Sequence, residues 1–164
     1  MPCLLGGLFR LTGNQAPMLA FGAIKGKLDY ERLEMRRFID HHGMTAFRMN
    51  PHFPVNTLVL MRGLIAARRM GVETAYVAAG LAAMWEQGLA MDDPAVIAAV
   101  LDAAGLNSAA ILAATHDAEI KAELVAATEA AVARGAFGIP TFFVDGEMYF
   151  GKERLGQIVQ QLAG

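Results

Sequence analysis

Few side chains in this chain can do chemistry, and its single cysteine, Cys3, sets the first limit. One cysteine cannot form a disulfide within the chain, and there is no Cys-x-x-Cys pair to act as a redox dithiol or to bind zinc. A dithiol mechanism is therefore excluded for this chain, and no bound metal is expected.

Polar residues also gather between Phe47 and Leu58, where two prolines, three positions apart, oppose any regular element. Asn56 is a strong candidate N-cap for a helix that runs to about Met70, and the N–H groups at such a helix start can bind an anion. His52 lies in the proline-rich loop before it. A histidine in that setting is more often a packed loop residue than a general base.

The elements that must position these residues are clearest at the C-terminal end. Thr141 to Val144 and Met148 to Phe150 are short apolar runs joined by the turn pair Asp145-Gly146, which predicts a β-hairpin. Pro140 opens the first strand, where its missing N–H costs no ladder bond, and it is a candidate cis proline. The alternative is a trans proline that ends a loop. A helix follows, and its apolar residues are expected to bury one face shared with the hairpin: Leu155, Ile158 and Leu162.

The rest of the chain is predicted to be mainly helical. Residues 3 to 9 are interpreted as a short strand before the turn signal Gly13-Asn14, and a helix from about Asp29 to His42 follows, with Asp29 as its cap. The alanine-rich region from Val72 to Arg134 contains further helix starts at Asp93, Asn107 and Asp117. No linker or repeat divides the sequence, so residues 1–164 are expected to form one domain.

Charge and hydropathy exclude several partners. With 14 basic and 16 acidic residues, the net charge of −2 gives no general attraction to nucleic acid. Arg62, Arg68 and Arg69 are the densest basic cluster, and they are expected to lie on a solvated helix face. No stretch is long and apolar enough to predict a membrane-spanning helix, and the first residues lack the features of a signal peptide. We therefore expect a cytoplasmic protein that does not associate with membranes.

Three segments together resemble one known family. They are Leu4-Leu5-Gly6-Gly7-Leu8-Phe9 with Thr12-Gly13-Asn14-Gln15, then His52-Phe53-Pro54-Val55-Asn56-Thr57, and finally residues 137–146 with 149–155. They are similar to the 2-hydroxychromene-2-carboxylate isomerases and the kappa-class glutathione transferases, both relatives of the DsbA-type oxidoreductases. The resemblance implies an α/β, thioredoxin-like (DsbA-like) sheet with an inserted all-helical block. Residues 1–15 and 136–164 would form the thioredoxin-like part and about 28–134 the mainly helical insertion.

The same resemblance implies glutathione as cofactor and assigns roles to individual residues. Asn14 and Lys25 would contact the tripeptide, and the backbone of Ile139, before Pro140, would pair with its cysteinyl part as an added strand does. Lys152 and Glu153 would meet the γ-glutamyl group at the start of the last helix. The substrate side of the cleft would be formed by His52 and Asn56.

The family's first β-α unit, with the serine that activates the glutathione thiol, is expected to be absent, so the catalytic residue is unknown. Only a thiolate is a competent nucleophile, which makes that hydroxyl important for turnover. Strand edges left open by the missing unit predict that another chain covers them, as a homodimer.

The resemblance therefore implies a glutathione-dependent cis–trans isomerase acting on a small-molecule intermediate of aromatic degradation. Two alternatives remain open. One is a kappa-class-like glutathione transferase or a DsbA-family oxidoreductase homologue, and the other is a catalytically impaired, truncated domain that only binds or dimerises. Calorimetry with glutathione separates the enzymatic readings from the last one.

Overall fold

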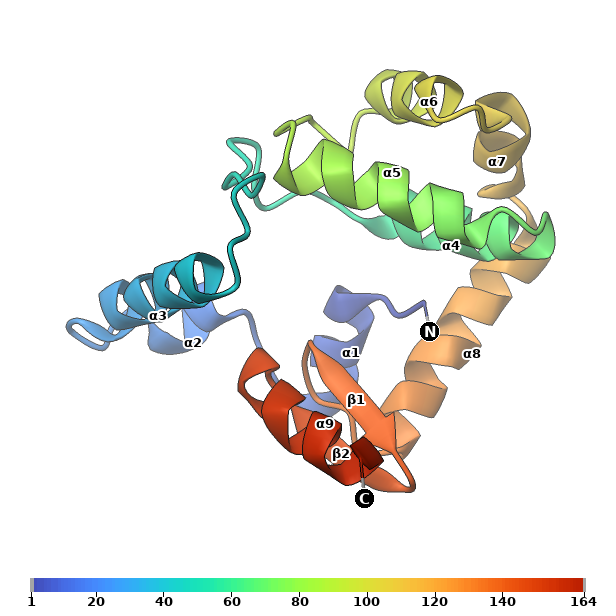
Figure 1. Cartoon of the computed structure of the whole chain (residues 1–164). Helices are drawn as coiled ribbons and strands as arrows, with labels where there is room; N and C mark the ends of the chain where they lie inside the picture. Colours follow the sequence, from blue (N-terminus) through green and yellow to red (C-terminus); the bar gives the residue numbers. More distant parts are fainter. Residues whose placement is uncertain (1, 164) are drawn as a thin grey trace.

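The computed structural model describes residues 2–163. In that range the chain forms nine α-helices, one 3-10 helix and one two-stranded sheet (Figure 1). Their bounds are α1 Leu5–Thr12, α2 Pro17–Phe21, α3 Lys27–His41, α4 Leu58–Arg69, α5 Glu73–Trp85, α6 Pro94–Ala103, α7 Ser108–Ala114, α8 Ala118–Ala133, β1 Thr141–Val144, β2 Glu147–Phe150, η1 Lys152–Arg154 and α9 Leu155–Ala163.

The strand predicted for residues 3 to 9 is wrong, because this segment begins helix α1. Leu4, Leu8 and Leu11 recur at helical spacing, and Leu8 is fully buried while its neighbours are more exposed. The helix ends at Gly13, which adopts the left-handed conformation that glycine tolerates best. Among the described residues, the sheet therefore consists of the C-terminal hairpin alone.

Helices α4 to α7 and the first half of α8 enclose the main core. The buried side chains are mostly aliphatic, and those of α6 and α8 recur at four-residue spacing, so these helices turn one face inward. Helix α4 lies deeper, with three consecutive residues buried. The core residues with 1% or less of their surface exposed are Ile65, Ala66, Ala67, Ala83, Met91, Ile97, Leu101 and Ile111. Asp93 and Asn107 cap α6 and α7 as predicted, by accepting hydrogen bonds from Ala95 and Ala110.

Helix α8 connects this block to the thioredoxin-like part. Figure 1 shows α8 running from α4 and α7 down to the hairpin, with α1 beside it. Leu8, Ala131 and Ala136 form a second, small core there, with Phe143 of β1 packed against it. The predicted hairpin is confirmed, with Thr141 paired to Phe150 and a two-residue turn at positive φ.

Helices α3 and α9 differ from the prediction in detail. Helix α3 begins at Lys27, so Asp29 lies inside its first turn and bonds Arg32 instead of capping it. On α9 only Ile158 is buried, while Leu155 and Leu162 remain exposed, because the two-stranded sheet covers only part of this face. Helices α2 and α3 project from the body as an arm (Figure 1) and contain no buried residue.

No helix in residues 2–163 combines the length and the apolar character that a membrane crossing requires.

Candidate functional site

The loop before β1, residues 137–140, is hydrogen-bonded to Asn14 near the start of the chain. The Asn14 side-chain nitrogen Nδ2 donates to the Phe137 carbonyl at 2.7 Å, and its Oδ1 accepts from the Gln15 backbone at 2.8 Å. Next in the loop, Gly138 lies under the Phe150 ring, and a Cβ there would come within 2.9 Å of that ring. Asn14 therefore holds the loop that precedes Ile139.

The Ile139–Pro140 peptide bond is cis, as predicted. The Pro140 carbonyl accepts from the Gly151 backbone at 3.0 Å, which continues the β1–β2 ladder by one pair. Because antiparallel strands alternate between hydrogen-bonded and non-bonded pairs, Phe142 also turns its backbone groups toward β2, while Thr141 and Phe143 turn theirs to the outer edge. Ile139 lies at the start of this open edge and is 60% exposed.

The start of η1 lies directly beyond that ladder pair. Gly151 has a positive φ of 97°, and the chain then enters Lys152 and Glu153. The Lys152 ammonium bonds the Glu153 carboxylate and also lies over the Phe38 ring at 4.7 Å from its centre. The bond from Lys152 holds the pKa of Glu153 below its usual value, and the residue's own backbone N–H adds to this. The structure therefore brings Asn14, the Ile139–Pro140 loop and the Lys152–Glu153 pair to one face.

The other predicted residues lie elsewhere. Lys25 is exposed in the turn between α2 and α3, which lies at the far end of the arm in Figure 1. His52 is exposed in the loop before α4, and the Asn56 side chain accepts from the Leu58 backbone at 3.0 Å. The predicted N-cap is wrong by one position, because Thr57 is the N-cap of α4 and Asn56 precedes it. Within the part of the chain that the structure describes, no hydrogen bond or ion pair joins Lys25, His52 or Asn56 to the Ile139 loop.

The contacts that hold the loop of residues 47–57 were not predicted from the sequence. Asn50 is buried, its Nδ2 donates to the carbonyls of Met84 and Leu89 at 2.9 and 2.8 Å, and its Oδ1 accepts from His52. Trp85 has Phe47 and Phe53 at ring-centre distances of 5.8 and 5.9 Å. An asparagine between a methionine and a proline carries no pattern that predicts such burial.

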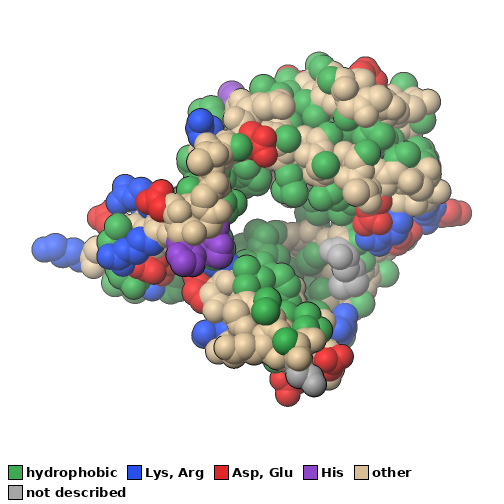
Figure 2. Space-filling view, in the orientation of Figure 1, with side chains coloured by type: hydrophobic (Ala, Val, Ile, Leu, Met, Phe, Trp, Pro, Cys, Tyr) green, Lys and Arg blue, Asp and Glu red, His purple; other side chains and the backbone are tan. Residues whose placement is uncertain are grey.

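The chain's only serine, Ser108, is buried at the start of α7 in the helical block. No three His, Cys, Asp or Glu side chains group into a potential metal site in residues 2–163. Figure 2 shows the face between the helical block and the hairpin unit as hollowed, with apolar side chains lining it and histidines at its edge.

Comparison with known proteins gives consistent results. A family model described as a DSBA-like thioredoxin domain matches residues 1–163. Two curated relatives, from Pseudomonas sp. (strain C18) and Pseudomonas putida, are both named 2-hydroxychromene-2-carboxylate isomerase. The chain is 27% identical to the first over 140 residues and 28% identical to the second over 134, which is 84% and 80% of this chain. It spans 64% of the length of each of these relatives.

A solved structure described as SeMet 2-hydroxychromene-2-carboxylate isomerase (HCCA isomerase) has the same fold. It matches with a TM-score of 0.79 at 25% identity and covers 97% of this chain and 76% of that chain. The thioredoxin-like architecture with a helical block, expected from the sequence motifs, is confirmed by the family model and by this neighbour. The chain therefore belongs to the DSBA-like thioredoxin domain family.

Proposed function

We propose that this chain binds glutathione and acts as a cis–trans isomerase of the 2-hydroxychromene-2-carboxylate type, on a small-molecule intermediate of aromatic degradation. The proposal rests on one observation above all. Exposed Ile139 precedes Pro140, whose carbonyl accepts from Gly151, and two residues beyond Gly151 lies Glu153, whose pKa is held below its usual value. The similarity to proteins named as such isomerases supports the reaction type.

The residues present fit a γ-glutamyl tripeptide. A short extended peptide can pair through its cysteinyl part with the backbone of Ile139, just before β1, without using the outward groups of Thr141 and Phe143. Glu153 would accept from the γ-glutamyl ammonium, and Lys152 would lie beside the carboxylate. Asn14 keeps the loop in place through Phe137. When bound, glutathione would supply the thiol that adds reversibly to an unsaturated substrate.

The substrate side would be the loop from Phe47 to Asn56. Its rings, with Trp85, offer an apolar surface on which an aromatic substrate can stack, and His52 is exposed beside them. Asn56 lies at the start of α4, where it already bonds a backbone N–H.

The test is calorimetric titration with glutathione. We expect Glu153→Gln to weaken binding about tenfold, since a charge-assisted hydrogen bond of about 1.5–3 kcal/mol would lose its charge. Glu86→Gln, at an exposed position after α5, is the matched control and should leave the affinity unchanged. Absence of heat at millimolar glutathione would refute the proposal, and so would equal effects of the two variants.

A second candidate is a glutathione-binding domain with turnover near background. It is favoured by Ser108, the one serine, being buried in the helical block. An absorbance assay with 2-hydroxychromene-2-carboxylate separates the two, because binding without isomerisation supports the second candidate. Conjugation of 1-chloro-2,4-dinitrobenzene without isomerisation would instead support a kappa-class-like transferase.

A further inference from the structure

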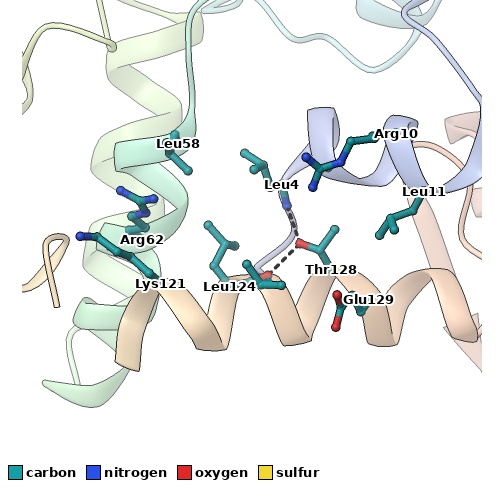
Figure 3. Close-up of a pocket in the computed structure, with 11 residues that line it drawn as sticks. Leu4, Arg10, Leu11, Leu58, Arg62, Lys121, Leu124, Thr128 and Glu129 are labelled. Atoms are coloured by element: carbon teal, nitrogen blue, oxygen red, sulfur yellow. Dashed lines mark hydrogen bonds between the residues drawn. The ribbon is translucent and has the colours of Figure 1, made fainter. Parts of the chain in front are cut away.

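A pocket lies between helices α1, α4 and α8, and it shares no residue with Asn14, the Ile139 loop or the Lys152–Glu153 pair. Its volume is about 110 Å³, and Figure 3 shows the residues around it. Its walls are largely aliphatic, and the residues that matter for its shape are Leu4, Leu11, Leu58, Leu124 and Val125. The pocket is smaller than the roughly 150 Å³ closed cavity known to hold a benzene molecule, but it opens to solvent beside Val125, so one ring can enter it with an edge left exposed.

The charges around this pocket are unbalanced. Arg62 of α4 and Lys121 of α8 lie together at one end of it, and Arg10 of α1 lies across from them (Figure 3). In residues 2–163 none of these three cations makes an ion pair, and the Arg62 Nε is buried without a hydrogen-bond partner. Only one carboxylate, that of Glu129, lines the pocket with them.

Neighbouring arginines on the same helix behave differently. Arg68 pairs with Glu73, and Arg69 pairs with Glu119 and Glu123. These two match the solvated face expected from the sequence, whereas Arg62 departs from it. A buried N–H left without an acceptor destabilises the fold, and two cations side by side repel each other. An anion at this end of the pocket would remove both costs.

We propose that the pocket binds a small carboxylate whose apolar body is the size of one ring. The ring lies against Leu4, Leu58 and Leu124, and the carboxylate accepts hydrogen bonds from Arg62 and Lys121. An arginine fork and an ammonium are both suited to a carboxylate, and leucine walls exclude anions that stay fully hydrated. The proposal does not depend on glutathione binding, because none of the pocket residues belongs to the proposed glutathione site.

Titration with sodium benzoate, followed by backbone amide NMR, tests the proposal on the whole chain. We expect shifts centred on α1, α4 and α8, and at least tenfold weaker binding of benzyl alcohol, which has the ring without the charge. The double variant Arg62→Gln/Lys121→Gln should weaken benzoate binding about tenfold. Arg36→Gln, which removes an exposed cation on α3, should leave it unchanged.

A second pair of variants keeps the test decisive if the double variant fails to fold. Val125 lines the pocket yet is 56% exposed, so Val125→Asp adds a competing carboxylate there without disturbing a core and should also weaken benzoate about tenfold. Val159→Asp, at a comparably exposed helix position on α9, is its control. Equal effects of the two aspartates, shifts confined to the hairpin, or displacement of benzoate by equimolar inorganic phosphate would each overturn the proposal.

Discussion

Glu153 shows how the ionisation of a single carboxylate is controlled by its immediate neighbours. The Lys152 ammonium, and then its own backbone N–H, stabilise its ionised form and hold its pKa below the usual value. Because the pKa is lower in the folded chain, this interaction stabilises the fold fully above the unfolded-state pKa of about 4.3 and is lost as pH falls through the folded value.

We expect Lys152→Gln to raise the pKa of Glu153 toward its ordinary value, with the carboxyl carbon shift in an NMR titration as the measurement. Lys121→Gln removes a lysine outside this pair and serves as the control. An unchanged midpoint in Lys152→Gln would show that the backbone N–H alone sets the pKa.

Asn14 is the residue for which the structure changes the expected role most. Asn14→Ala removes the donor to the Phe137 carbonyl, which lies near solvent and can bond water instead. We therefore expect a loss of only about 1 kcal/mol in the free energy of unfolding, measured with urea. Gln160→Ala, at an exposed position on α9, should change it by less than about 0.5 kcal/mol. Equal losses would mean that the loop is held by other contacts.

The sequence predicts residue types at the site better than it predicts their contacts. Asn14 and Phe137 are 123 positions apart, and no local pattern links them. The same is true of Arg62 and Lys121, which come together only because α4 packs on α8. The start of α4 could be predicted to within one residue from Asn56, since its bond to Leu58 is local, although Thr57 is the N-cap.

At the scale of elements, the crossing of α4 and α5 depends on one missing side chain. Tyr76 is buried, which raises the pKa of its hydroxyl, and that hydroxyl donates to the Leu60 carbonyl at 2.9 Å. A Cβ at Gly63 would lie 2.3 Å from the same hydroxyl oxygen. The two helices can approach this closely only because position 63 is glycine.

We expect Gly63→Ala to lower the free energy of unfolding by about 1–3 kcal/mol, because either the Tyr76 hydrogen bond or the helix contact must yield. Gly80→Ala is the matched control on α5, where a Cβ meets nothing within 4 Å. It should raise stability by up to about 1 kcal/mol through helix propensity. Urea unfolding of both variants gives the comparison, and a neutral Gly63→Ala would show that the two helices separate without cost.

Local signals also explain which elements were predictable. The turn pair Asp145-Gly146 defines the hairpin by itself, since both residues adopt positive φ. The segment from Leu4 to Leu11 was misinterpreted because its two adjacent glycines suggested a break, although its leucines follow helical spacing. The exposed face of α9 could not be foreseen, since burial there depends on how many strands lie beneath it.

On the scale of the whole molecule, the outer edge of β1 presents backbone N–H and C=O groups that lack hydrogen-bond partners within residues 2–163. The outward backbone groups of Thr141 and Phe143 have no partner among the described residues, and an unpaired edge favours association with another strand. The same four-residue edge on a second copy is complementary to it in the antiparallel direction, which supports the expected homodimer.

We expect light scattering to give a dimer mass at micromolar concentration and a monomer mass for Thr141→Pro, which removes an outward N–H without touching the β1–β2 ladder. Thr141→Val loses the hydroxyl bond to Gly138 in the same way but keeps the N–H, so it should remain dimeric. A monomeric native chain, or a dimeric proline variant, would contradict pairing through this edge.

The arm of α2 and α3 is expected to unfold separately from the rest of the molecule, at a lower free energy. Helix α3 contains no fully buried residue, and apart from Lys152 over its Phe38 ring it is supported mainly by pairs along its own surface, such as Lys27 with Glu31 and Glu34 with Arg37. A 15-residue helix supported in this way is marginal in water. Native-state hydrogen exchange should therefore show α3 amides opening several kcal/mol below those of α4, as a separate unit that melts while the core persists. Exchange of both helices at one common free energy would mean that the arm folds and unfolds with the core.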